Sequence, residues 1–91
     1  MDPNTGKIID GIENATHQVM KNLQAVLESA GMTFRNVVKS TIYLKSMEDF
    51  SAMNEVYSSY LEKDYYPARE TVQVSYLPKN VEVEISMIAH K

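Results

Sequence analysis

The apolar residues in the first third of the chain recur at helical spacing and stop at a glycine. The stripe consists of Ile12, Ala15, Val19, Leu23, Val26, Leu27 and Ala30. Apolar residues three and four positions apart lie on one face of a helix. Gly31 follows directly, and a glycine just past the last turn commonly ends a helix. The pattern predicts a helix over residues 11–30 with one buried face.

The periodicity then changes to alternation between Val37 and Lys45, in a segment rich in β-branched and aromatic residues. We expect Val38, Ile42 and Leu44 to face the core of the protein. The residues that we expect to face the other way are Lys39, Thr41, Tyr43 and Lys45. This segment is therefore predicted to be a strand with one buried face.

A second helix and two further β segments follow. Ser46–Asp49 resembles a capping box, with Asp in place of the usual Glu or Gln. The apolar stripe after it is Phe50, Met53, Tyr57, Tyr60 and Leu61. After a loop at 63–67, β-rich segments at 69–77 and 81–89 flank Pro78-Lys79-Asn80 and suggest a hairpin. The expected class is α+β, with two helices packed on one face of a mixed sheet.

Composition narrows the classes of function. Ninety-one residues make one domain, 1–91, which is marginally stable unless subunits associate. The net charge of −3 argues against a nucleic-acid binder, and no segment is apolar enough to cross a membrane. The chain has no cysteine and its first residues do not resemble a signal peptide. We expect a cytoplasmic protein, or a mitochondrial one if a further segment precedes it.

Arg69 is the first candidate for a binding role. It begins a β segment, two residues before Thr71 and on the same face. A guanidinium group presents paired donors that match a carboxylate, so Arg69 could hold a ligand carboxylate. The alternative is a surface ion pair with Glu70 or Asp64.

Glu84 is the second candidate, fifteen residues later in the last β segment. It shares a face with Glu82, opposite Val83 and Ile85. A carboxylate there could orient or deprotonate a water molecule. The alternative is a solvated strand face, which we expect for Glu82.

Asn54 lies on the apolar stripe of the second helix, four residues after Phe50. It is either a structural hydrogen-bonding residue or a group in a pocket. We predict no metal site, because His17 and His90 lack neighbours at the spacing of metal ligands.

Short segments along the whole chain match a known family. They are Met1–Gly6, Asn22-Leu23, Ala30-Gly31, Asn36–Thr41, Met47–Phe50, Asn54–Tyr57, Tyr66–Arg69, Val72–Val74, Leu77–Lys79 and Val83–Ile85. On these segments the chain resembles the RidA/YjgF/UK114 family of enamine and imine deaminases. The resemblance implies a chorismate-mutase-like fold and a homotrimer with ligand clefts between subunits.

The resemblance also implies a reaction. Members hydrolyse 2-aminoacrylate and similar imines, released by pyridoxal-phosphate enzymes, to 2-oxo acids and ammonia, without a cofactor of their own. By this likeness Arg69 would hold the substrate carboxylate and Glu84 would position the attacking water. Thr71 would occupy a pocket position where relatives often carry Cys or a small residue. The alternative is a non-catalytic module that binds small carboxylates or has a regulatory role, as described for relatives that are translation inhibitors.

The chain departs from the family pattern at its N-terminal end, where the sequence begins in the turn predicted at residues 2–6. Family members carry two strands before this turn, and three strands are few for two long helices. We therefore expect that an N-terminal hairpin is missing. The strand edge that it leaves unpaired is expected to destabilise the chain or to pair with another copy.

Overall fold

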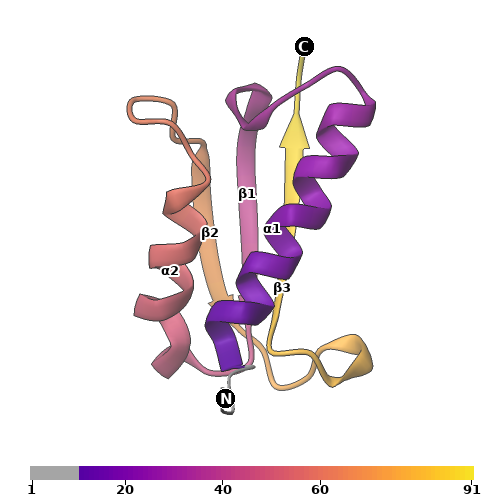
Figure 1. Ribbon diagram of the computed structural model, residues 1–91. Coiled ribbons are helices and arrows are strands. Elements are labelled where there is room, and N and C mark those ends of the chain that lie inside the picture. Colours follow the sequence, from indigo (N-terminus) through magenta and orange to yellow (C-terminus); the bar gives the residue numbers. More distant parts are fainter. Residues whose placement is uncertain (1–10) are drawn as a thin grey trace, which may run out of the picture.

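The computed structural model describes residues 11–91 and consists of two helices and three strands (Figure 1). The helices are α1 (Gly11–Ser29) and α2 (Phe50–Ser59), and the strands are β1 (Val37–Leu44), β2 (Ala68–Gln73) and β3 (Val83–Ala89). The turn predicted at residues 2–6 lies outside the described residues. No helix within 11–91 is long and apolar enough to span a membrane.

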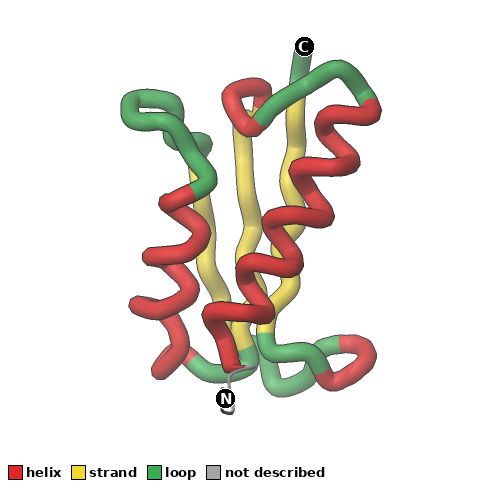
Figure 2. Tube along the Cα trace, in the orientation of Figure 1, coloured by secondary structure: helices red, strands yellow, loops and turns green. Residues whose placement is uncertain are grey.

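The three strands form one mixed sheet in the order β2-β1-β3. Strand β1 runs parallel to β2 and antiparallel to β3. Both helices lie on the same side of the strands (Figures 1 and 2). This arrangement confirms the predicted α+β class with two helices on one face of a mixed sheet.

The predicted hairpin between the last two β segments is wrong, because β1 lies between β2 and β3. Helix α2 carries the chain back so that β2 runs parallel to β1, as a strand-helix-strand crossover does. The long connection at 74–82 then takes the chain to the other edge of β1. The alternation of apolar residues shows which face of a strand is buried, but not which strand lies beside it.

Helix α1 buries nearly the face that its sequence predicts. Leu27 is buried, but the centre of the buried face is formed by Thr16 and Met20, and Val26 is 65% exposed. The Thr16 hydroxyl donates a hydrogen bond to the Ile12 carbonyl oxygen at 2.7 Å, which satisfies it within the core. Gly31 has a φ of +75°, as expected for the residue that ends the helix.

The predicted buried face of β1 is confirmed at Ile42 and Leu44 but is wrong at Val38. An irregularity between Val37 and Lys39 shifts the register against β3. It places Val37 in the core at 5% exposure and leaves Val38 52% exposed. An extra residue in one strand reverses the alternation beyond it, which is why the pattern misassigned Val38.

The core lies between the helices and one face of the sheet. Its buried members are Met20, Leu27, Phe34, Val37, Ile42, Leu44, Met53, Tyr57, Val83 and Ile85. The Tyr57 hydroxyl donates to the buried Ser40 hydroxyl at 2.9 Å and so joins α2 to β1. Within residues 11–91, the other face of the sheet carries no helix, and β2 and β3 each pair along one edge only.

Candidate functional site: Arg69 and Asn54 between strand β2 and helix α2

Arg69 lies at the start of β2, opposite Ser40 of β1 in the strand register. Ser40 faces α2, so Arg69 also projects from the helix side of the sheet. Its Nη1 atom donates a hydrogen bond to Oδ1 of Asn54, on α2. The guanidinium carbon lies 5.5 Å from the ring centroids of both Phe50 and Tyr57. An amide and two aromatic rings therefore fix the position of this cation.

The charge of Arg69 has no carboxylate partner within residues 11–91. Glu70 projects from the opposite face of the sheet, where its Oε1 atom lies 3.7 Å from Nζ of Lys39. The surface ion pair considered as an alternative role for Arg69 is thus not formed. A guanidinium group has five N–H donors, and Asn54 engages only Nη1, so most of its donors are available to an anion.

A pocket of about 260 Å³ opens beside Arg69, between α2 and the loop that leads into β2. Its lining residues are Asn54, Tyr57, Ser58, Leu61, Tyr66, Pro67 and Arg69. One part of this wall carries the cation and the amide, and another part is aliphatic and aromatic. Such a pocket suits an organic acid with an apolar group attached to its carboxylate. We call it the Arg69 pocket.

Two further predicted site residues lie on the same side of the sheet as Arg69. Asn54 is a pocket group and not a buried structural residue, since it is partly exposed and contacts Arg69. Thr71 lies opposite Ile42 in the strand register. Its hydroxyl oxygen is buried and has no hydrogen-bond partner within the described residues. The structure therefore brings together Arg69 and Asn54, with Thr71 further along the same strand face.

Glu84 lies elsewhere. It pairs with Tyr43 across β1 and β3, and it is exposed between the buried residues Val83 and Ile85. Because those two residues face the helices, Glu84 points from the opposite face of the sheet. Strand β1 also separates β3 from the strand that carries Arg69. Within one chain, Glu84 and Arg69 do not share a site.

The sequence did not single out the residues that form the apolar wall of the pocket. Tyr57 and Leu61 were assigned to the core stripe of α2, and Tyr66 to a loop. The available signal was the aromatic pair Tyr65-Tyr66 directly before Pro67, in a loop of otherwise polar residues. Tyr66 is 61% exposed, so its ring is accessible to a ligand in the pocket that it lines.

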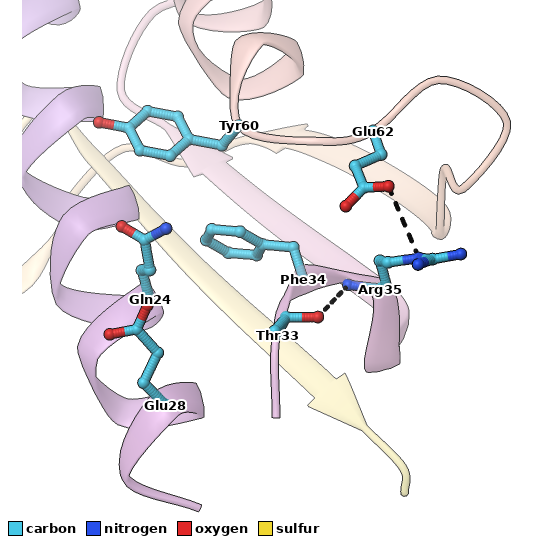
Figure 3. Close-up of a pocket in the computed structure, with 7 residues that line it drawn as sticks. All are labelled: Gln24, Glu28, Thr33, Phe34, Arg35, Tyr60 and Glu62. Atoms are coloured by element: carbon cyan, nitrogen blue, oxygen red, sulfur yellow. Dashed lines mark hydrogen bonds and ion pairs between the residues drawn. The ribbon is translucent and has the colours of Figure 1, made fainter. Parts of the chain in front are cut away.

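A second pocket of about 230 Å³ lies between α1 and the chain at 33–35 (Figure 3). Its residues are Gln24, Glu28, Thr33, Phe34, Arg35, Tyr60 and Glu62. Nε of Arg35 lies 3.6 Å from Oε1 of Glu62, and its guanidinium carbon lies 4.0 Å above the ring of Tyr65. This arginine is therefore paired with a carboxylate of the chain itself, whereas Arg69 has no such partner within residues 11–91. Within 11–91, no group of three His, Cys, Asp or Glu side chains could hold a metal ion.

Comparison with known proteins agrees with this architecture. The family model described as endoribonuclease L-PSP matches residues 1–91. A RutC family protein of Pyrococcus horikoshii is 50% identical over all of this chain and 72% of its own length. The human protein named 2-iminobutanoate/2-iminopropanoate deaminase is 40% identical over 98% of this chain and 65% of its own length.

Solved structures show the same fold. The crystal structure of RidA from a Psychrobacter species superposes with a TM-score of 0.86 at 38% sequence identity. The match covers all of this chain and 73% of the Psychrobacter chain. The chain therefore belongs to the endoribonuclease L-PSP family, the RidA/YjgF family that its sequence segments resemble.

Proposed function

We propose that this chain is a subunit of an imine deaminase that hydrolyses 2-imino acids to 2-oxo acids and ammonia. The expected substrates include 2-iminobutanoate and 2-iminopropanoate, the compounds in the name of the human relative. The observation that carries the proposal is Arg69, a fixed guanidinium that has no carboxylate partner among residues 11–91 and lies in a pocket lined by both polar and apolar side chains. These substrates combine a carboxylate with a short apolar group, and the reaction needs no cofactor.

The residues divide the chemistry between binding and proton transfer. Arg69 holds the substrate carboxylate, and Asn54 keeps the guanidinium in place by accepting the bond from Nη1. Water adds its oxygen to the C=N carbon, and a carboxylate that accepts one of its protons makes it a better nucleophile. The nitrogen takes up this proton and then the proton of the new hydroxyl group and leaves as ammonia, while the carbon becomes the carbonyl carbon of the 2-oxo acid. Glu84 is the proposed carboxylate.

Glu84 can serve this role only from a second copy of the chain, because it lies on the other face of the sheet from Arg69. We therefore infer that each site lies between two subunits, in the homotrimer that the resemblance to the RidA/YjgF family implies. The uncovered sheet face supports association, since Ile88 and Val38 are more than half exposed on strands β3 and β1. The unpaired edges of β2 and β3 offer further surface for contact between copies.

Catalysis can be tested with a dehydratase that generates 2-aminoacrylate. Purified chain added to this mixture is expected to accelerate release of the 2-oxo acid above the spontaneous rate. Glu84→Gln should abolish the acceleration but leave binding of the 2-oxo acid intact. If wild-type chain binds the 2-oxo acid without accelerating its release, the deaminase proposal is wrong.

Binding without acceleration would favour the alternative function, a non-catalytic module that binds small carboxylates or has a regulatory role. One observation supports this alternative: no carboxylate contacts Arg69 within the described residues, so one chain carries the clamp alone. RNA binding is a weaker candidate despite the name of the family model. The net charge of −3 opposes the contacts with phosphate groups on which such binding depends.

A further inference from the structure

The connection between α2 and β2, at residues 60–67, forms one side of the Arg69 pocket. Leu61, Tyr66 and Pro67 of this connection line the pocket, and Pro67 lies two residues before Arg69. A displacement of the connection would therefore move part of the lining together with the start of the strand that carries the guanidinium group. The contacts that hold the connection in place thus bear on the site.

Burial does not hold this connection in place. Residues 62–66 are all exposed, so they bury little apolar surface against the core. The backbone N–H of Tyr65 donates to the Glu62 carbonyl oxygen at 3.0 Å and closes a turn. Within this turn Asp64 has a φ of +73°, in the left-handed region that costs free energy for a residue other than glycine. An exposed turn of this kind opens readily unless contacts from outside stabilise it.

Arg35 provides such contacts from the turn Phe34–Asn36, which directly precedes β1. Its Nε atom lies 3.6 Å from Oε1 of Glu62 (Figure 3), and its guanidinium carbon lies 4.0 Å from the centroid of the Tyr65 ring. One side chain thus contacts both residues that the backbone hydrogen bond of the turn joins. In the part of the chain that the structure describes, no other side chain forms a hydrogen bond or ion pair with residues 62–66.

We propose that Arg35 is a positioning residue for the Arg69 site and acts through the connection between α2 and β2. Arg35 does not line the Arg69 pocket, so it does not contact a ligand there. Its contacts with the turn keep the neighbouring residue Tyr66 beside Arg69 before a ligand arrives. A lining that is already in place loses less conformational entropy on binding. The role in ligand binding rests on the proposed function, whereas the stabilisation of the turn does not.

Hydrogen exchange of the backbone amides in the ligand-free chain, followed by NMR, tests whether Arg35 stabilises the turn. Arg35→Met should make the Tyr65 amide exchange about threefold to tenfold faster, because it removes the ion pair and the contact between cation and ring. Arg35→Lys should restore part of the protection, since it keeps a cation near Glu62. Lys63→Met removes an equal charge from the same turn and is the matched control, which should exchange as the wild type does. Unchanged exchange in Arg35→Met would overturn the proposal.

Titration with pyruvate tests whether the turn positions the Arg69 site. Arg35→Met should weaken pyruvate binding about threefold, and Lys63→Met should leave it unchanged. If Arg35 acts through Tyr65, adding Tyr65→Leu to Arg35→Met should cause no further loss, whereas independent effects would multiply. Faster exchange with unchanged pyruvate binding, or losses that multiply, would overturn the positioning role.

The two measurements also separate this proposal from the proposed function. A wild-type chain that binds no pyruvate would refute both the proposed function and the role of Arg35 in binding. A wild-type chain that binds pyruvate, with the same Tyr65 exchange in Arg35→Met, would refute the role of Arg35 alone.

Discussion

At the scale of single residues, the two arginines of the chain behave differently. Arg35 is engaged by Glu62 and Tyr65, whereas Arg69 is held by an amide and has no other hydrogen-bond partner in the part of the chain that the structure describes. An amide oxygen fixes the guanidinium without neutralising its charge. Because of this difference we propose Arg69, and not Arg35, as the anchor for an anion.

The first prediction concerns the anchor itself. Arg69→Ala should weaken binding of a small 2-oxo acid about 10- to 100-fold, because charged hydrogen bonds contribute about 1.5–3 kcal/mol. Arg69→Lys should restore only part of the affinity, since an ammonium group lacks the paired donors. Calorimetric titration measures both. Lys21→Ala, which removes an equal charge from the exposed surface of α1, is the control and should bind as the wild type does. An unchanged affinity in Arg69→Ala would refute the clamp.

The second prediction tests the role of Asn54. Asn54→Asp replaces the accepting amide with a carboxylate that forms an ion pair with Arg69 and competes with the ligand. It should weaken 2-oxo acid binding more than Asn54→Ala, which only frees the guanidinium. Calorimetric titration of both variants with the same 2-oxo acid measures which of them binds more weakly. The reverse order would show that Asn54 does not hold Arg69 in solution.

At the scale of elements, the sequence predicted both helices, the three β segments and the layer that they form. It did not predict which strands pair, because α2 and the connection at 74–82 decide that. It also missed the irregularity at Val37–Lys39, since one extra residue leaves no mark in the composition of the strand. For the site, residue chemistry suggested Arg69, Asn54 and Glu84 as candidates. Only the register of the strands showed that Glu84 faces away from the other two.

The third prediction uses the irregularity in β1. Val37→Ala should lower the free energy of unfolding by about 1–3 kcal/mol, because it removes two buried methyl groups from the core. Val38→Ala removes the same atoms from an exposed position and should change the free energy of unfolding by less than about 0.5 kcal/mol. Urea denaturation of the two variants compares them directly. Equal effects would contradict the placement of Val37 in the core and Val38 outside it.

At the scale of the whole molecule, the account depends on association. One chain offers the clamp on the helix side of the sheet and Glu84 on the uncovered side. A catalytic site that uses both residues therefore has to be built from two copies. Association would also cover apolar residues on the open face and the unpaired strand edges.

The most direct test of this shared site is complementation between two inactive variants. Arg69→Ala and Glu84→Gln should each lack deaminase activity when assayed alone. After the two are unfolded and refolded together in equal amounts, about a quarter of the sites combine an intact Arg69 with an intact Glu84 from the neighbouring copy. The mixture should then recover about a quarter of the wild-type rate of 2-oxo acid release. A mixture that stays as inactive as its separate components, although its subunits have exchanged, would contradict the shared site.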